Sequence, residues 1–578
     1  MKKRTRAFIS LAMTVCLTLS NSMLATASET NDTNNKTLLT QEDLDSALHE
    51  EGLTRSFERA SVHDPSIVTT TDKDGKTLYY VFGTHMAVAK SYDLTNWEQV
   101  YDGYKKDSPL FGTINEKGET VPISFDTAFE NNAYTGTVTT NIDGSLSQTE
   151  FGYYNAKAWH TALDNYHVDG NLWAPDVIYN KKMQKWTMYM SLNGSQSNSV
   201  IVLLTADDIE GPYVYQGPVV YSGFYNSSEA ISYMNTDLEL VYGTLNSLPE
   251  KYNLADRNAW GNYWPHAIDP CVYYDENGNL RMTYGSWSGG IYELMLDETT
   301  GLRDYSVTYE DVQSGQNITS DKYFGTHLAG GYYVSGEASY IKFINDRYYL
   351  FVTNGDLGAD GNYQMRVFSS DNPDGPFLDT KGESAIYDSY KINYNSNYGH
   401  IYSGTDNGAE GSTAGARLMT NYKWNFMDAG EVSQGHNSVL VNDDGAFVIY
   451  HTRFDNGIDG HELRVHQLYT VGNGSLVAAP CEYDALLKDK ASYTKEETGG
   501  SYDVIFGKYD TNPHWVGGKK SDGGSLMYAG TTDCETPIQL TLAPDGTVMS
   551  DDARLGSWSL ADDGKYATVT INDAIDDE

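Results

Sequence analysis

Four short segments of this chain place an acid or a histidine just ahead of an apolar strand, in a position suited to proton transfer. The segments are HDPSIV (63–68), IDPCVYY (268–274), GEASYI (336–341) and GHNSVLV (435–441). Their leading residues are Asp64, Asp269, Glu337 and His436. Carboxyl and imidazole groups are common general acids and bases. If the fold brings these four residues together, they provide both a proton donor and a proton acceptor.

These segments belong to a two-strand repeat that occurs five times. Each is followed by a second strand rich in aromatic residues, such as YYVFGT (79–84). The fifth copy, WAPDVIY (173–179), carries Ala174 at the leading position. In three copies the leading residue and a small residue of the second strand are 16 positions apart. These pairs are Asp269 and Gly285, Glu337 and Thr353, and His436 and Thr452.

Such self-similarity is typical of radially repeated β architectures, in which each repeat forms one blade. No long segment has the 3.6-residue period of an amphipathic helix, so helix content should be low. We therefore predict an all-β fold, a five-bladed β-propeller in which the first strand of every blade faces the central channel. The five leading residues would then converge at one mouth of the channel.

The composition restricts the partners and indicates the destination of the chain. Asp and Glu outnumber Lys and Arg by 79 to 39, a net charge of −40, which argues against nucleic-acid binding. Residues 1–27 begin with basic residues, continue with an apolar stretch and end in small residues, so they predict a signal peptide. No later segment is apolar over about 18 residues, so no membrane span is expected after cleavage. We expect a secreted monomer.

The rest of the chain divides into three parts. Residues 28–58 are polar and acidic and predict a flexible leader. Residues 59–485 contain the five repeats, with long insertions at 98–170 and 222–265 that would lie at the channel mouth. Residues 490–578 have short alternating strands and Gly/Asp turns, which predict a small β-barrel-like domain. Because the sequence stops just after a strand, we expect this domain to be incomplete.

Three cysteines follow the signal peptide. Cys271 falls in a predicted inner strand, where we expect a buried free thiol. Pairing between Cys481 and Cys534 is left open.

Paired carboxyl groups are the usual catalysts of glycoside hydrolysis, one protonated and the other ionised. Glu337 is the better acid because its neighbours are neutral and partial burial would raise its pKa. Asp64 is the better base. Asp269 would orient Glu337 and keep it protonated through like-charge proximity. Any one of these acids could be a turn residue, but three at one repeat position favour function, since converging carboxylates destabilise a fold.

Two further side chains lie near these acids in the repeat. Asp176 stands two residues past the leading position, deeper in the channel, and we interpret it as structural or metal-associated rather than catalytic. His436 is aimed at the channel axis, where a neutral imidazole beside several acids suits a hydrated cation such as calcium. His85, His461 and His466 have no comparable position and are interpreted as structural.

Taken in order, five motifs resemble those of the five-bladed arabinanases of glycoside hydrolase family 43, over about residues 59–480. They are HDPSIV, NLWAPDVIYN, AIDPCV with GSWSGGIY, GEASYIKF and GHNSV. The resemblance implies that Asp64 is the base, Glu337 the acid and Asp269 the residue that tunes the acid. It also places His436 near one calcium ion, largely coordinated by water. The C-terminal part is similar to the small β-barrel of the larger extracellular members.

The resemblance also implies a set of substrate-binding residues. Besides Asp64 and Asp269 they are Trp173, Gly194, His266, Ala267, Ile268, Ser286, Trp287 and Ser288. His266 stands where the family usually has asparagine. The implied reaction is inverting endo-hydrolysis of α-1,5-L-arabinofuranosidic bonds in arabinan, a side chain of pectin. The alternatives are an exo-acting α-L-arabinofuranosidase or β-xylosidase, and a non-catalytic carbohydrate-binding propeller.

Overall fold

The computed structural model describes residues 57–571. It leaves out residues 104–107, 124, 130–134, 153–171, 194–197, 227–230, 256–259, 287–288, 315–316, 332–335, 356, 360–362, 388–414, 458–459, 486–491, 508–513, 520–524 and 530–533. The predicted signal peptide and nearly all of the predicted leader lie outside the described residues. No helix in the described part is long and apolar enough to cross a membrane.

Five sheets follow one another along the chain. The first contains β1 (Ser66–Thr71), β2 (Thr77–Phe82), β3 (Ala87–Ser91) and β4 (Glu98–Asp102). The second contains β9 (Leu172–Asn180), β10 (Lys185–Asn193), β11 (Ser199–Ala206) and β12 (Tyr213–Ser222), extended by β5 (Phe111–Ile114) and β6 (Thr120–Pro122). The third contains β13 (Cys271–Tyr274), β14 (Leu280–Gly285), β15 (Ile291–Leu296), β16 (Val312–Ser314), β17 (Asn317–Asp321) and β18 (Gly325–Ala329).

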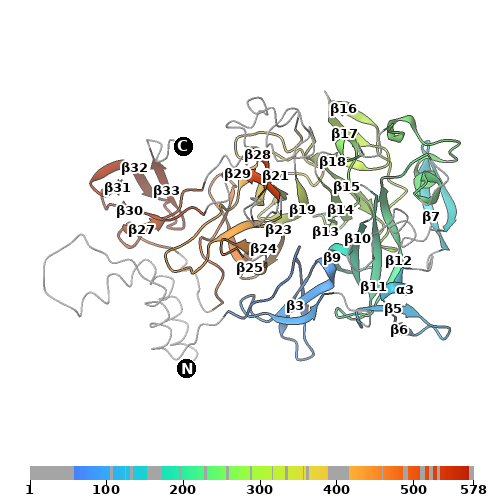
Figure 1. Cartoon of the computed structure of the whole chain (residues 1–578), viewed down its shortest axis with the longest axis horizontal. Coiled ribbons are helices and arrows are strands. Elements are labelled where there is room, and N and C mark those ends of the chain that lie inside the picture. Colours follow the sequence, from blue (N-terminus) through green and yellow to red (C-terminus); the bar gives the residue numbers. More distant parts are fainter. Residues whose placement is uncertain are drawn as a thin grey trace.

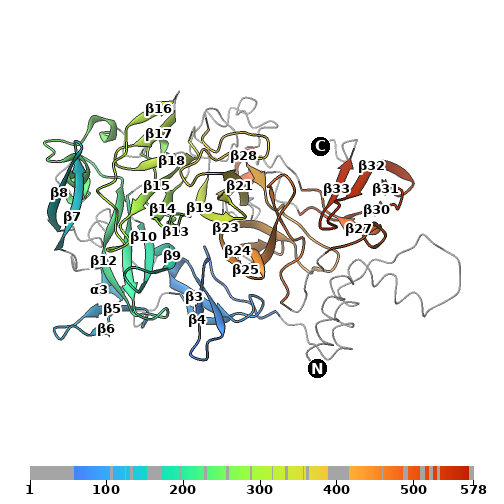
Figure 2. The same ribbon diagram turned by 180° about the vertical axis from the view of Figure 1, so that it is seen from behind.

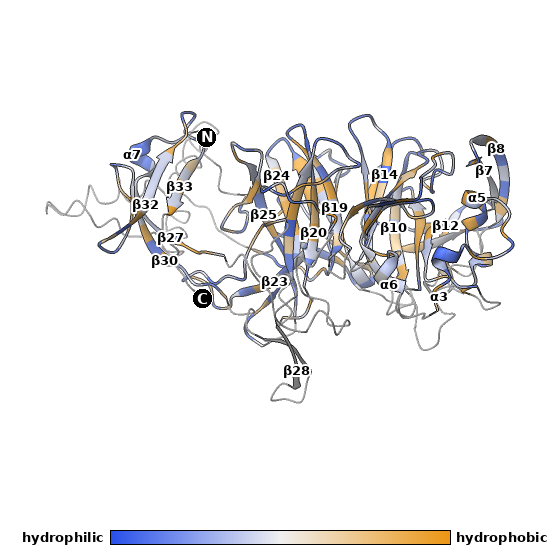
Figure 3. Cartoon of the chain, turned by 90° about the horizontal axis from the view of Figure 1, so that it is seen from above, coloured by the Kyte–Doolittle hydropathy of each residue, from blue (hydrophilic) through white to orange (hydrophobic). Residues whose placement is uncertain are grey.

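The fourth and fifth sheets have four strands each. The fourth contains β19 (Glu337–Ile344), β20 (Arg347–Asn354), β21 (Gln364–Ser370) and β22 (Ala416–Arg417). The fifth contains β23 (Glu431–Asn442), β24 (Gly445–Phe454), β25 (Glu462–Thr470) and β26 (Leu476–Ala478). Hydrophobic residues concentrate along these strands, as Figure 3 shows for β10, β14, β19, β20 and β24.

The remaining elements are small. The helices of the described residues are short, as predicted: η1 (Thr84–Met86), α3 (Phe125–Ala128), η3 (Tyr233–Asn235), α5 (Leu238–Tyr242), η4 (Glu250–Tyr252), α6 (Trp260–Tyr263) and α7 (Lys495–Thr498). Most come from the two insertions. The first insertion also supplies β5, β6 and the hairpin of β7 (Thr135–Ile142) and β8 (Ser145–Gly152).

The C-terminal part forms a sheet with its own small core. It contains β27 (Gly500–Val504), β30 (Ile538–Leu542), β31 (Thr547–Ser550), β32 (Ala553–Leu560) and β33 (Ala567–Ile571). Its core residues are Leu540, Leu542, Val548 and Trp558. This sheet lies to one side of the other five (Figures 1 and 2). The strands β28 (His514–Lys519) and β29 (Ser525–Ala529) form a separate hairpin.

The first strands of the five sheets contact one another in a closed cyclic order. The contacts run from β1 to β9, β13, β19 and β23, and from β23 back to β1. At corresponding places just ahead of or within the five first strands, a residue has a left-handed backbone: Asp64 (φ 56°), Ala174 (φ 43°), Asp269 (φ 54°), Ala338 (φ 58°) and His436 (φ 47°). Such conformations are rare for residues other than glycine.

The backbone N–H of each left-handed residue donates to a side chain of the preceding sheet. Ala174 donates to Thr84 Oγ1 at 2.8 Å, and Asp269 donates to Ser191 Oγ at 3.1 Å. The other three bonds are Ala338 N–H to Asp269 Oδ2 (3.1 Å), His436 N–H to Thr353 Oγ1 (3.1 Å) and Asp64 N–H to His451 Nδ1 (3.2 Å). These five bonds connect every sheet to the next around the ring.

The left-handed residue of the fourth sheet is Ala338, and this corrects the predicted alignment by one residue. Glu337 pairs with Thr353, whereas the residue that occupies the equivalent place in the fifth sheet is Gly435, paired with His451. Glu337 therefore precedes the position shared by Asp64, Asp269 and His436. The spacing of 16 residues did not reveal this shift because β19 and β23 carry register irregularities at this end.

A second ring of hydrogen bonds lies two and three residues further along the first strands. The side chains of Ser438, Ser66, Asp176, Cys271 and Tyr340 accept from the N–H groups of Ile67, Val177, Val272, Ile341 and Val439 respectively. Asp176 also accepts from Ser66 Oγ at 2.5 Å. Asp176 is thus structural, which is one of the two roles predicted for it, and Cys271 is a buried thiol as expected. Cys481 and Cys534 do not form a disulfide with each other.

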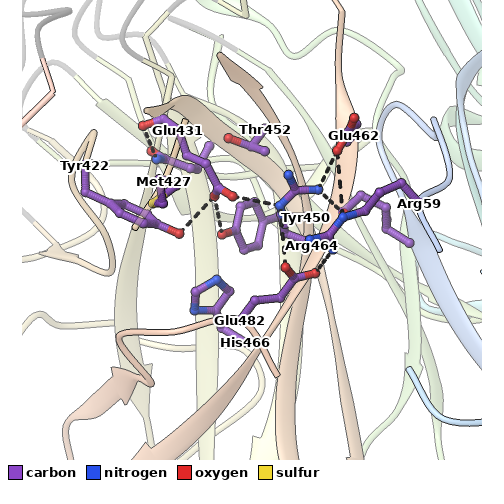
Figure 4. A network of polar contacts seen from close by, with 12 residues as sticks. Arg59, Tyr422, Met427, Glu431, Tyr450, Thr452, Glu462, Arg464, His466 and Glu482 are labelled. Atoms are coloured by element: carbon purple, nitrogen blue, oxygen red, sulfur yellow. Dashed lines mark hydrogen bonds and ion pairs between the residues drawn. The ribbon is translucent and has the colours of Figure 1, made fainter. Parts of the chain in front are cut away.

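A buried charge network completes the junction between the fifth sheet and the segment ahead of β1 (Figure 4). Glu431 accepts from Arg464 Nε at 2.7 Å and from the Tyr422 hydroxyl at 2.9 Å. Burial opposes ionisation of Glu431, but Arg464, His466 and the hydrogen bond from Tyr422 together outweigh burial and lower the pKa of this carboxyl. Arg464 approaches Glu482, which in turn pairs with Arg59. The network therefore connects the beginning of the ring to its end.

The second ring yields a stability prediction. In Ser438→Ala the buried N–H of Ile67 loses its acceptor, so unfolding by urea should require about 1–3 kcal/mol less free energy than in the wild type. Ser557→Ala removes a hydroxyl from an exposed position of β32 and should change stability by less than about 0.5 kcal/mol. If the two variants lost the same free energy of unfolding, the hydrogen bond from Ile67 to Ser438 would not stabilise the contact between the first and fifth sheets.

Candidate active site

The left-handed residues bring two of the predicted acids and the predicted histidine together. Asp64 Oδ1 lies 2.9 Å from His436 Nδ1, and Asp64 Oδ2 lies 2.8 Å from His63 Nδ1. Thr84 Oγ1 also donates to Asp64 Oδ2. Burial alone would raise the pKa of Asp64, but the charges of His436 and His63 hold that pKa well below its ordinary value. Asp64 is therefore ionised and able to accept a proton.

Asp269 has the opposite electrostatic character. Burial raises its pKa, His436 opposes the rise, and the charges of Glu337 and Asp64 add to it, so that the pKa of Asp269 is about 7. Its Oδ2 accepts from the N–H of Ala338, the residue next to Glu337. Asp269 therefore holds the backbone next to Glu337 and also interacts electrostatically with the Glu337 carboxyl group.

Glu337 is held at both carboxyl oxygens. The hydroxyl of Tyr363 donates to Oε1 at 2.6 Å, and Ser286 Oγ approaches Oε2 at 3.4 Å. Ser286 is fully buried at the end of β14. The three predicted acids thus come from the first, third and fourth sheets and surround the imidazole of His436, whose pKa responds to all three.

The predicted substrate-binding residues differ in what they offer. Trp173 is half-buried on β9, and His266 is neutral because burial lowers its pKa to about 4. Ala267 is buried, and its N–H and C=O are bonded to Ser222 and Ser199. Ile268 is also buried, and its C=O accepts from Gly285. These last two residues position Asp269. Gly194, Trp287 and Ser288 lie outside the described residues.

His436 is the residue predicted to lie near a cation. A metal-bound histidine commonly donates its second ring N–H to a carboxylate. The Nδ1 of His436 faces Asp64, which leaves Nε2 for a cation, and three carboxylates surround the ring. Burial lowers the pKa of His436, but Asp64 and Asp269 raise it to about 9, so the ring is protonated and not neutral as predicted, and binding of a metal would release a proton.

A second group of possible ligands lies on the other side of Asp64. Donor atoms of His63, Asp64 and His451 lie within 4.8 Å of one another, and the rings of the two histidines stack at 4.0 Å. Two nitrogen donors suit a transition metal better than calcium. However, His451 Nδ1 already accepts the N–H of Asp64, so it holds the backbone of the base in place.

Sequence reasoning missed four residues of this site. Thr84 ends the aromatic segment YYVFGT just after β2, and His451 precedes Thr452 within β24, so the repeat contained a signal for both. His63 directly precedes Asp64 in the motif HDPSIV. Tyr363 stands just ahead of β21 and no repeat marks it. Only the paired strands place it beside Glu337.

The site predicts how activity should depend on pH without His436. Removing its positive charge in His436→Ala should raise the pKa of Asp64, because that charge lowers it in the wild type. The base is then protonated at higher pH, and the acidic limb of the kcat/KM profile should move to higher pH, with turnover at least about tenfold lower. If the acidic limb of the kcat/KM profile did not move in His436→Ala, His436 would have only a packing role.

The chain was compared with protein families, curated proteins and solved structures. No family model matches it. It is 32% identical over 520 residues to the extracellular endo-α-(1→5)-L-arabinanase of Thermotoga petrophila, covering 89% of this chain and 86% of the relative. It is 29% identical to the extracellular endo-α-(1→5)-L-arabinanase 2 of Bacillus subtilis, covering 74% and 72%. The crystal structure of a family 43 glycoside hydrolase from Bacillus licheniformis is 26% identical, with a TM-score of 0.62, and the match covers 89% of this chain and 90% of that one.

Proposed function

This chain belongs to the extracellular endo-α-(1→5)-L-arabinanases of glycoside hydrolase family 43, and we propose that it cleaves arabinan by inversion, with Asp64 as base and Glu337 as acid. It is a secreted enzyme that hydrolyses internal α-1,5 bonds between L-arabinofuranosyl units. The observation that carries this proposal is the ionised state of Asp64, which His436 and His63 maintain despite burial and which suits it to be the base.

The chemistry requires one proton to leave a water molecule and another to reach the leaving sugar. Asp64 takes the first proton as the water oxygen attacks the anomeric carbon. Glu337 gives the second to the glycosidic oxygen as the bond breaks. Asp269 holds the backbone beside the acid by accepting from the N–H of Ala338, and it lies within the electrostatic reach of Glu337. Because the base and the acid stand on different sheets, we expect room for a water molecule between them and hence inversion.

The finer architecture is part of the same proposal. We infer that the five sheets are the five blades of a propeller spanning residues 59–485, since their first strands contact in cyclic order. Residues 490–578 would form the barrel-like domain. A single calcium ion near His436 Nε2 would add positive charge beside the three acids. Trp173, His266 and Ser286 are the described residues that we expect nearest the substrate, together with Gly194, Trp287 and Ser288.

Product analysis tests the reaction itself. With linear arabinan the enzyme should release mixed oligosaccharides from the earliest time points, and NMR of the first turnover should show the inverted anomer. Release of arabinose alone would indicate exo action. A retained anomer would instead assign Asp64 as a nucleophile, and absence of cleavage would leave a carbohydrate-binding protein.

The two acids can be separated by the leaving group. An aryl arabinofuranoside needs little protonation of its leaving oxygen, so Glu337→Ala should retain much more activity on it than on arabinan. Asp64→Ala should be impaired on both, by about a hundredfold or more, because the water loses its base. Asp269→Ala should be intermediate. If Glu337→Ala lost activity equally on both substrates, Glu337 would not be the acid.

A further inference from the structure

Tyr363 stands next to the acid and is not used in the mechanism above. It is buried, just ahead of β21, and its hydroxyl donates to Glu337 Oε1 at 2.6 Å. The other oxygen, Oε2, faces Ser286 Oγ at 3.4 Å. The two oxygens of the acid therefore have different surroundings, with the closer donor on Oε1.

The Tyr363 ring fits in its place because position 435 is a glycine. A Cβ atom on Gly435 would lie 2.1 Å from Tyr363 Cδ1, so any larger residue at position 435 would push the ring away. The ring also stacks on His451, with centroids 5.8 Å apart and an angle of 25° between the planes. His451 in turn accepts the N–H of the base, Asp64. The ring is thus packed against β23 and β24 of the fifth sheet.

The phenol is a donor at every pH at which the enzyme would work. Burial, and then the charges of Glu337, Asp64 and Asp269, raise its pKa well above the ordinary value. A carboxylic acid carries a single O–H group. Tyr363 donates to Oε1 at 2.6 Å, whereas Ser286 donates to Oε2 only at 3.4 Å, so the proton of the acid is placed on Oε2.

We propose that Tyr363 is a positioning residue for Glu337, one that directs the acidic proton to Oε2 and stabilises the carboxylate left after proton transfer. In that step the O–H bond at Oε2 breaks, an O–H bond forms at the glycosidic oxygen, and the bond from that oxygen to the anomeric carbon breaks. Negative charge develops on Glu337, and a hydrogen bond to a charged acceptor is about twice as strong as one to a neutral acceptor. The bond from Tyr363 therefore strengthens as the reaction proceeds.

This role rests on the proposed function of Glu337 and makes a narrower claim. Tyr363→Phe keeps the ring and removes only the donor. We expect kcat on linear arabinan to fall about tenfold to a hundredfold, and kcat on an aryl arabinofuranoside with a good leaving group to fall less than about threefold. A residue that only fills space would impair both substrates equally.

Tyr422→Phe is the matched control. It also removes a buried hydroxyl that bonds a buried carboxylate, Glu431, but in the fifth-sheet network. It should lower thermal stability without changing the ratio of the two activities. Gly435→Ala, which displaces the Tyr363 ring, should shift that ratio in the same direction as Tyr363→Phe.

The outcomes separate the two claims. Wild type and Glu337→Ala are measured in the same assays, so failure of the wild type to cleave arabinan, or equal losses in Glu337→Ala, would overturn the proposed function. If these behave as expected but Tyr363→Phe loses equal activity on both substrates, or none on either, Tyr363 does not position the acid.

Discussion

The hydrogen bond from the N–H of a left-handed residue to a side chain of the preceding sheet is the interaction on which this structure depends. It occurs at all five junctions between neighbouring sheets, with hydroxyl, carboxylate or imidazole acceptors. Left-handed backbone is unfavourable for residues with a Cβ, so each bond offsets a local cost. In return, the chain turns sharply at these positions and aims Asp64, Asp269 and His436 at one place. The same bonds that join the sheets therefore build the site.

The concentration of acids at this place is stabilised by His436. Two buried carboxylates, Asp64 and Asp269, and the half-buried Glu337 would repel one another, and burial would favour their neutral forms. The imidazole of His436, with its pKa raised to about 9, supplies a compensating positive charge next to Asp64. Asp64 remains ionised while Asp269 holds its proton up to about pH 7. The site thus keeps two neighbouring carboxyl groups in different protonation states at the same pH.

The first and fifth sheets are joined by further polar contacts, in addition to the two rings of hydrogen bonds along the first strands. Leu463 N–H donates to the C=O of Ala60, and the network of Glu431, Arg464 and Glu482 reaches Arg59. This junction joins segments that are far apart in sequence, so its closure carries a high entropic cost. Ionic groups that are paired and hydrogen-bonded in this way specify a single register, because any misplaced partner would leave a buried charge unpaired.

The repeat of an acid or histidine, an apolar strand and an aromatic strand determined that the chain is built from sheets and which residues lead them. It identified Asp64, Asp269, Glu337 and His436, and the deeper place of Asp176, because side-chain type and spacing are properties of the sequence itself. Tertiary structure alone decided the shift that puts Ala338, not Glu337, at the left-handed position, since register irregularities in β19 and β23 have no signature in spacing. It alone decided that Tyr363 meets Glu337 and that His451 holds Asp64. Those contacts join residues on different strands, and the distance between two strands is set by how they pair and pack.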